Sequence, residues 1–350
     1  MPRYRVALNG YGRIGRCVLR ALHERAQAAN FDIVALVDIA DQQSIEYLTR
    51  FDSTHGRFPG DVRVEGDCLH INGVCIQVLH AATPEEVDWR SLDIDLLLEC
   101  SGAYTRREEA QRFLDGGVPR ILFSQPMHSI EDVDATLVYG INHQQLTGQE
   151  RILSNASCTT NCGVPLLRLL HEAVGIEQVF ITTIHSAMND QPVIDAYHHE
   201  DLRRTRSAFQ SVIPVSTGLA RGIERLLPEL SGRVQAKAIR VPTVNVSCLD
   251  ITVQTCRPTD ADSINRMFSD AAHSQRFKGL LNYTELPHAS CDFNHDGHSA
   301  VVDGSQTRMC GPHMLNLLAW FDNEWGFANR MLDVAEHLLT LSSTAARNTP

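Results

Sequence analysis

Short, continuously apolar runs alternate with helix-period segments through the first 126 residues. The run "RVAL" predicts a buried strand, and after it Ile14, Val18, Leu19 and Leu22 recur at the spacing of one helix face. The same alternation predicts further strands at 32–40, 92–104 and 120–126, and helices at 41–50 and 106–118. Continuously apolar strands that alternate with helices are typical of a parallel sheet covered on both faces.

The pattern changes after residue 158. The later apolar segments are longer, alternate with polar residues and are rich in Val, Ile and Thr, at 178–188, 235–243, 245–256 and 298–309. Such segments favour a mostly antiparallel sheet with one covered face. The stretch 189–216 has no sustained periodicity and carries Arg203, Arg204 and Arg206. A loop of that length inside a compact domain is usually functional.

This change divides the chain of 350 residues into two predicted domains. We expect residues 1–157 and 323–350 to form an α/β domain, with the amphipathic helix 323–341 packing back on it. Residues 158–322 are then a second, α+β domain built on the mostly antiparallel sheet.

Composition narrows the choice of partners. The net charge of −11 and the pI near 5.8 argue against nucleic acid or an anionic membrane, although a local basic cluster could still bind a small anion. No apolar run approaches the roughly 20 residues that span a bilayer. The N-terminus enters a strand pattern at once, so we expect a cytoplasmic protein whose ten cysteines are thiols rather than a disulfide framework.

A glycine-rich turn supplies the first candidate site. Gly10, Gly12 and Gly15 fit G-x-G-x-x-G after a strand and at the start of a helix, the setting that binds a dinucleotide pyrophosphate. Asp38 ends the next strand, where a carboxylate takes the ribose hydroxyls and repels a 2′-phosphate. The pattern predicts a Rossmann domain that binds NAD rather than NADP; the alternative is a solvated aspartate at a strand end.

"SNASCTTNC" holds Cys158 and Cys162 and supplies the second candidate site. No second Cys pair or His pair at zinc spacing accompanies them, and a redox motif needs CxxC, so we expect no metal and no disulfide here. A cysteine at a predicted helix start is a natural nucleophile, and a histidine would help it to ionise near neutrality. His185, which ends an apolar strand, is the best base candidate; the alternative is a purely structural histidine.

The motifs together resemble one superfamily. "ALNGYGRIGR", "SNASCTTNC", "STGLA", "RVPTVNVS" and "DNEWGFANR", with a histidine 27 residues after the cysteine, are similar to the phosphorylating glyceraldehyde-3-phosphate dehydrogenases, in the same order through nearly the whole chain. The resemblance implies an NAD-dependent aldehyde dehydrogenase and a homotetramer. It also implies that Cys158 is the nucleophile, that His185 activates it, and that Cys162 packs on the same helix without a catalytic role.

The resemblance assigns the remaining site residues as well. The implied cofactor-binding set is Gly10, Gly12, Arg13, Ile14, Gly15, Asp38, Ser101, Gly102 and Asn323, of which Asn323 orients the nicotinamide carboxamide. The implied substrate-binding set is Ser157, Thr159, Arg206, Thr217, Gly218 and Arg240, with the arginines near the anion sites and the other residues as a cradle for attacking phosphate.

Two residues depart from the pattern of the superfamily. After its catalytic histidine that pattern has two threonines that hold substrate phosphate, and here Met188 and Asp190 replace them. A carboxylate costs a nearby phosphate at least about 1 kcal/mol per charge even in water-like dielectric. We therefore expect the phosphate to bind differently, or Asp190 to point away and pair with Arg203 or Arg204.

Other segments favour one branch of the superfamily. "YTELPHASCDFNHD" and "HSAVVDGSQTR" most resemble the D-erythrose-4-phosphate dehydrogenases, which oxidise a small phosphorylated aldose, erythrose 4-phosphate, and resolve the thioester with water in bacterial pyridoxal phosphate (pyridoxine) biosynthesis. The alternatives are a phosphorylating glyceraldehyde-3-phosphate dehydrogenase and a non-catalytic scaffold that has kept the fold.

Overall fold

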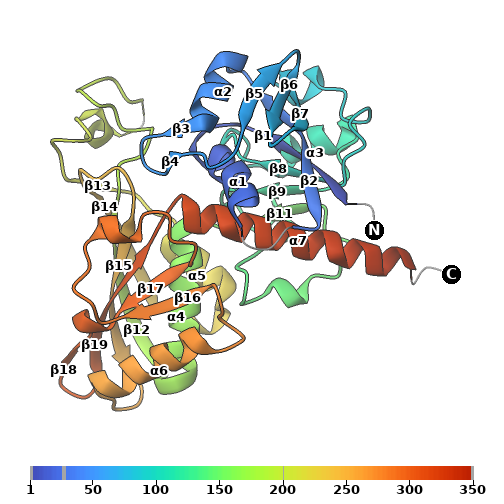
Figure 1. Ribbon diagram of the computed structural model, residues 1–350. Coiled ribbons are helices and arrows are strands. Elements are labelled where there is room, and N and C mark those ends of the chain that lie inside the picture. Colours follow the sequence, from blue (N-terminus) through green and yellow to red (C-terminus); the bar gives the residue numbers. More distant parts are fainter. Residues whose placement is uncertain (1–2, 26–28, 200, 348–350) are drawn as a thin grey trace. The chain divides into compact units, whose positions relative to one another are not determined.

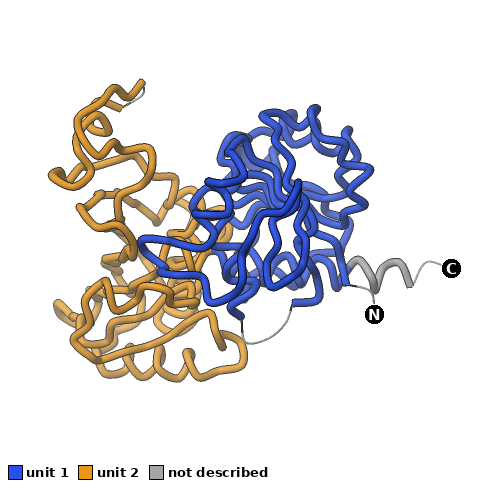
Figure 2. Tube along the Cα trace, turned by 45° about the horizontal axis from the view of Figure 1, so that its top comes forward, with its two compact units in different colours: residues 1–156, 328–350 blue, residues 157–327 orange. Residues whose placement is uncertain are grey.

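The computed structural model describes residues 3–25, 29–199 and 201–347. The chain forms two compact units, residues 1–156 with 328–350 and residues 157–327 (Figure 2). The first predicted boundary, 157/158, lies one residue later than the observed one, and the second, 322/323, lies five residues earlier. Among the described helices none is long and apolar enough to cross a membrane.

Unit 1 is built on a nine-stranded sheet (Figure 1). Its order is β10 (Ala135–Thr136), β11 (Ile152–Ser154), β9 (Ile121–Phe123), β8 (Leu96–Glu99), β1 (Tyr4–Asn9), β2 (Phe31–Asp38), β7 (Val74–His80), β6 (Cys68–Ile71) and β5 (Val62–Glu65). The pairs from β10 to β7 are parallel, which confirms the prediction. The antiparallel edge of β5, β6 and β7 was not predicted.

A hairpin closes this edge and carries a disulfide. Asn72 and Gly73 join β6 to β7 with φ of 50° and 85°, the two positive values that a two-residue type I′ turn needs. The hairpin brings Cys68 and Cys75 to 5.4 Å between Cα atoms, and the structure joins them in a disulfide. The expectation of thiols throughout is therefore wrong for this pair. The other eight cysteines, Cys158 and Cys162 included, form no disulfide in the described part of the chain.

Helices complete unit 1. They are α1 (Arg13–Glu24), α2 (Gln42–Arg50), α3 (Arg107–Gly116) and the larger part of α7 (Trp325–Arg347); the short strands β3 (Phe51–Asp52) and β4 (Gly56–Arg57) pair with each other. Val18 and Leu19 on the predicted apolar face of α1 are fully buried. The α7 helix lies against this unit, where Arg25 donates to the carbonyl of Asn329 over 2.9 Å.

Unit 2 is built on a second sheet. Its order is β13 (Ile213–Val215), β14 (Val234–Arg240), β12 (Ile176–His185), β15 (Ser247–Thr255), β19 (Met314–Phe321), β17 (Ala300–Asp303) and β16 (Leu281–Thr284), with β18 (Arg308–Cys310) paired to β19. Its helices are α4 (Cys158–Val174), α5 (Leu219–Leu226) and α6 (Ala261–His273). Among the described strands of this sheet only the β12–β14 and β16–β17 pairs are parallel, so the prediction of a mostly antiparallel sheet is confirmed. The parallel β12–β14 pair sets His185 opposite Arg240.

Candidate active site

The glycine turn after β1 packs so closely against neighbouring backbone that Gly10 and Gly15 leave no room for a side chain. Gly10 has φ of 85°, and a Cβ on it would lie 2.3 Å from the backbone nitrogen of Ser101. A Cβ on Gly15 would lie 2.1 Å from the carbonyl oxygen of Gly10. A Cβ on Gly12 would meet nothing within 4 Å, so the space in front of the first turn of α1 is open. This cradle fits a dinucleotide pyrophosphate approaching a helix N-terminus.

Asp38 reaches the same turn from the end of β2. Its carboxylate accepts hydrogen bonds from the backbone N–H of Tyr11 at 2.5 Å and of Ala40 at 2.8 Å. The carboxylate is thus held at the carboxyl edge of the parallel sheet beside the glycine turn, where the ribose hydroxyls of a bound dinucleotide would need an acceptor.

The structure places the other cofactor candidates of unit 1 as follows. Arg13 and Ile14 open α1, and the Arg13 guanidinium is 2.5 Å from the Asp52 carboxylate, so its side chain is already paired. Ser101 and Gly102 form the turn after β8, and Gly102 has φ of 76°. The Ser101 backbone N–H donates a hydrogen bond to Glu99, a residue that was not among the site candidates from the sequence.

Unit 2 brings Cys158 and His185 together. Cys158 is the first residue of α4, after the N-cap Ser157, and His185 is the last residue of β12. The Cys158 Sγ lies 3.7 Å from the His185 Nε2. Cys162 is one turn along α4 and fully buried, which is consistent with a packing role.

The hydrogen bonds of His185 fix its tautomer. Its Nδ1 lies 2.9 Å from the carbonyl oxygen of Ser186, and because a carbonyl only accepts, Nδ1 carries the proton. In the neutral ring the unprotonated Nε2 then faces the thiol. Burial lowers the pKa of His185, so the neutral ring predominates at neutral pH. His185 is therefore arranged as a base toward Cys158.

Burial favours the neutral form of the Cys158 thiol. Burial raises its pKa to about 12, although the residue keeps some exposure, and the N–H of Thr159 offsets only part of this effect. The help toward ionisation that the sequence led us to expect is available from His185, whose Nε2 lies 3.7 Å from the sulfur. The pair is a neutral thiol beside a neutral imidazole, so the proton must move as the thiol reacts.

Hydroxyl groups surround the start of α4. The Ser157 Oγ accepts from the N–H of Thr160 at 3.1 Å and lies 2.9 Å from the Thr159 Oγ1. Thr217 and Gly218 stand at the start of α5, where the Thr217 Oγ1 accepts from the N–H of Leu219 at 3.2 Å. Besides accepting these bonds, the serine and threonine hydroxyls can donate hydrogen bonds to a bound anion.

Asp190 is bound to arginines. Its carboxylate accepts from both terminal nitrogens of Arg240, at 2.5 and 3.0 Å, and from the Arg204 Nη1 at 3.0 Å. Burial acts to raise the pKa of Asp190, but Arg240 and Arg204 outweigh it and hold that pKa below its ordinary value. Met188 packs here too, with its Sδ 3.6 Å from the Arg240 Nη2.

Arg204, one of the two partners expected for Asp190, joins this cluster, whereas Arg206, which the resemblance assigned near the anion sites, does not. Arg206 pairs with Asp195 at 2.9 Å on the surface, and Arg204 takes the position beside Asp190. "RRTR" offered three candidates within one irregular loop, and only the folded loop distinguishes them.

Asn323 is held by two serines. The hydroxyls of Ser186 and Ser247 donate to its Oδ1 at 3.1 and 2.8 Å. Both of these bonds engage the oxygen, so the amide orientation is fixed and the Nδ2 group is directed elsewhere as a donor. The carbonyl oxygen of a nicotinamide carboxamide is an acceptor suited to the Asn323 Nδ2 group.

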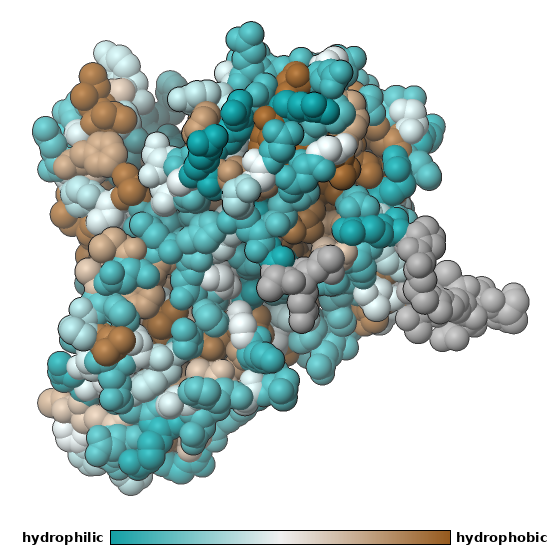
Figure 3. Space-filling view, in the orientation of Figure 1, coloured by the Kyte–Doolittle hydropathy of each residue, from teal (hydrophilic) through white to brown (hydrophobic). Residues whose placement is uncertain are grey.

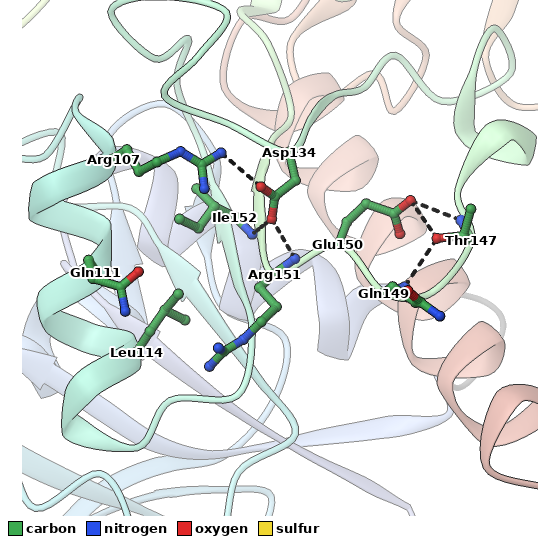
Figure 4. A pocket seen from close by; sticks show the side chains of 9 residues that line it. All are labelled: Arg107, Gln111, Leu114, Asp134, Thr147, Gln149, Glu150, Arg151 and Ile152. Carbon is green, nitrogen blue, oxygen red and sulfur yellow. Dashed lines mark hydrogen bonds and ion pairs between the residues drawn. The ribbon is translucent and has the colours of Figure 1, made fainter. Parts of the chain in front are cut away.

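A separate cavity of about 460 Å³ lies in unit 1 (Figure 4). It is lined by Arg107, Gln111, Leu114, Asp134, Thr147, Gln149, Glu150, Arg151 and Ile152. The cavity lies where β10 and β11 begin, so it is at the amino edge of the sheet, opposite the glycine turn. Arg107 pairs with Asp134 at 2.8 Å, Glu150 accepts from the Thr147 hydroxyl at 2.9 Å, and the Arg151 side chain donates to the Pro119 carbonyl at 3.0 Å, so each of these charged groups already has a partner.

The glycine turn with Asp38 beside it defines a class of protein, those that bind a dinucleotide on a Rossmann domain. Comparison with family models makes this more specific. Residues 4–107 match the model described as glyceraldehyde 3-phosphate dehydrogenase, NAD binding domain, and residues 157–323 match the C-terminal domain of the same enzyme. The chain belongs to the glyceraldehyde 3-phosphate dehydrogenase family, and NAD is its cofactor.

Proposed function

We propose that this protein is an aldehyde dehydrogenase that oxidises D-erythrose 4-phosphate to 4-phospho-D-erythronate with NAD. The observation that carries the proposal is the position of Asp190 on Arg240. Its place in pyridoxal phosphate biosynthesis rests on the sequence resemblance, and its setting in the cytoplasm rests on the apolar pattern of the sequence.

Arg240 is the residue whose guanidinium would receive an anion. A guanidinium binds a carboxylate or a phosphate through the same two-pronged geometry, and here Asp190 occupies it. The phosphate of a triose substrate would have to displace this carboxylate or lie against it. A substrate one carbon longer carries its phosphate farther from the aldehyde, and its additional hydroxyl can donate to a carboxylate such as Asp190.

The first step of the proposed cycle follows from the Cys158–His185 pair. As Cys158 attacks the aldehyde carbon, its proton passes to the His185 Nε2, and a hemithioacetal forms. The N–H of Cys158 at the start of α4 and the new imidazolium stabilise the oxygen that gains charge. The bond from Nδ1 to the Ser186 carbonyl keeps the ring in place through the transfer.

The later steps release the acid. Bound NAD would supply the hydride acceptor that turns the hemithioacetal on Cys158 into a thioester, and the His185 imidazolium then gives its proton up to solvent. His185, again neutral, removes a proton from water as the water attacks the thioester, and the thiol leaves with the acid as the other product. The balance is aldehyde, NAD⁺ and water to acid, NADH and a proton.

The alternative is phosphorylating glyceraldehyde-3-phosphate dehydrogenase, in which inorganic phosphate cleaves the thioester. The hydroxyls at the start of α4, together with Thr217, favour it, because they would suit an attacking phosphate. The two proposals share Cys158 and His185 and differ in the acceptor and in the length of the aldose.

The deciding experiment follows NADH formation with erythrose 4-phosphate and with glyceraldehyde 3-phosphate, each with and without inorganic phosphate. We expect a much higher kcat/KM for the four-carbon sugar, with no need of phosphate. A preference for the triose with strict phosphate dependence would establish the alternative.

Replacing Asp190 by threonine should move the preference toward the triose. The substitution frees both terminal nitrogens of Arg240, and a hydrogen bond to a charged group contributes about 1.5–3 kcal/mol. We expect kcat/KM for glyceraldehyde 3-phosphate to rise about tenfold or more and that for erythrose 4-phosphate to fall. Asp270→Thr, at an exposed position of α6, is the control. An unchanged ratio of the two kcat/KM values in Asp190→Thr would contradict a role for Asp190 in specificity.

We also propose a homotetramer. The segment 191–212 carries large, solvent-exposed apolar side chains, and apolar surface gathers over it (Figure 3, upper left). The exposed residues are Val193, Ile194, Tyr197, Leu202, Phe209 and Val212. Exposed apolar patches of this kind mark interaction surfaces, and a second copy of the chain is the partner that the resemblance implies. Sedimentation of the purified protein as a monomer would rule this out.

A further inference from the structure

Glu99 is a fully buried carboxylate at the carboxyl edge of the unit 1 sheet. It ends β8 and stands directly opposite Asn9, the last residue of β1, in the parallel pair. The glycine turn follows Asn9 and the Ser101 turn follows Glu99. The proposed reaction gives this residue no role, yet it lies between the two turns of the cofactor site.

The Glu99 carboxylate accepts from donors on both turns. The Asn9 Nδ2 donates to Oε2, and the Ser101 backbone N–H donates to Oε1 at 2.7 Å. The Ser101 hydroxyl also donates to Oε1. An ionised carboxylate only accepts, so three donors match the charged form. Since a Cβ on Gly10 would collide with the Ser101 backbone, the position of one turn sets that of the other.

Burial opposes this charged form. It raises the pKa of Glu99 to about 7, against the effect of the Ser101 and Asn9 bonds, and no cation among the described residues is near enough to lower it. The titratable groups that face Glu99 are Cys100 and Tyr104. Burial raises the pKa of each above its ordinary value, so both stay neutral through the physiological range.

Protonation would change the bonds to Ser101. A protonated carboxyl has one fewer acceptor position and one new donor, so its O–H would turn toward the Ser101 Oγ and reverse that bond. The Oγ already accepts from the N–H of Ala103 at 3.2 Å. The bonds from the Asn9 Nδ2 and the Ser101 N–H would remain but lose the negative charge that strengthens them, and the link between the two turns would weaken.

We propose that Glu99 is a positioning residue for NAD: its ionised carboxylate ties the glycine turn to the Ser101 turn, and its protonation weakens cofactor binding near neutral pH. The inference rests on NAD binding by unit 1 and not on the identity of the aldehyde.

The test is calorimetric titration of the full-length protein with NAD from pH 5.5 to 8.5. We expect the Kd of the wild type to rise about tenfold toward the acid end, which corresponds to a pKa one unit lower in the complex. Near pH 7 the binding heat should also depend on the ionisation enthalpy of the buffer, because binding releases protons. Glu99→Gln should bind NAD more weakly at pH 8.5 and lose the pH dependence, while Glu85→Gln, at an exposed carboxylate, should keep the wild-type profile.

Ser101→Ala is a second variant that keeps the test decisive if Glu99→Gln does not fold. It removes one donor that stabilises the charged carboxylate, so the midpoint of the pH profile should move to higher pH. A flat wild-type profile, a wild-type profile retained in Glu99→Gln, or an unmoved midpoint in Ser101→Ala would each overturn the inference. Because NAD binding is measured without aldehyde, a wrong substrate assignment leaves the result unaffected.

Discussion

Replacing Cys158 by serine should lower kcat/KM for aldehyde oxidation by about 10⁴-fold or more. Loss of the nucleophile in an enzyme that works through a covalent intermediate removes on the order of 10⁶ from kcat, and a serine hydroxyl is a far weaker nucleophile at neutral pH. His185 lies 3.7 Å from the sulfur and cannot replace it as an acyl acceptor in this geometry. The measurement is NADH formation under saturating NAD.

Cys162→Ala is the matched control. Cys162 is on the same helix and fully buried, so the variant loses some packing but no reacting group. We expect nearly wild-type kcat in Cys162→Ala and unchanged NAD affinity in Cys158→Ser. An active Cys158→Ser variant, or equal losses in the two variants, would show that Cys158 is not the nucleophile.

Replacing His185 by asparagine should lower kcat by about 10²–10⁴-fold, the contribution of a positioned general base. The variant should also change the pH profile. In the wild type burial places the pKa of His185 below its ordinary value, so activity should persist through neutrality and fall only at lower pH, as the imidazole gains a proton. His185→Asn should lose this acid limb.

The reactivity of the Cys158 thiol in His185→Asn provides a second test. Since the pKa of the Cys158 thiol is raised to about 12, the thiolate population, and with it the rate of alkylation by iodoacetamide, should increase about tenfold per pH unit from 6 to 10. His273→Asn, at an exposed position, should keep the wild-type profiles. An alkylation rate in His185→Asn that is high and constant near neutral pH would mean that the thiolate is stabilised by another group.

The structure also corrects predictions from the sequence where the pairing of two residues depends on the fold. The hairpin at Asn72 and Gly73 had a readable signal, because Asn-Gly between two short apolar runs is typical of a two-residue turn. The Cys68–Cys75 disulfide depends on that hairpin, and an argument from composition alone missed it. The pairing of Arg206 with Asp195 at the surface had no comparable signal, because residues 189–212 follow no period from which a side-chain direction could be derived.

The sequence by itself determined what depends on local pattern. Apolar periodicity placed the parallel strands and the helices, the spacing of Gly10, Gly12 and Gly15 placed the dinucleotide turn, and the residues around Cys158 placed it at a helix start. These features are set by neighbours along the chain, through backbone freedom, hydrogen-bond geometry and the burial of one face.

Only the tertiary structure decided which distant groups meet and what their charges become. The parallel β12–β14 pair set His185 beside Arg240, and the folded loop set Asp190 on Arg240. Burial, which no local pattern measures, kept the Cys158 thiol protonated and raised the pKa of Glu99 to about 7. Pairing and desolvation act through space, so these properties exist only once the chain has folded.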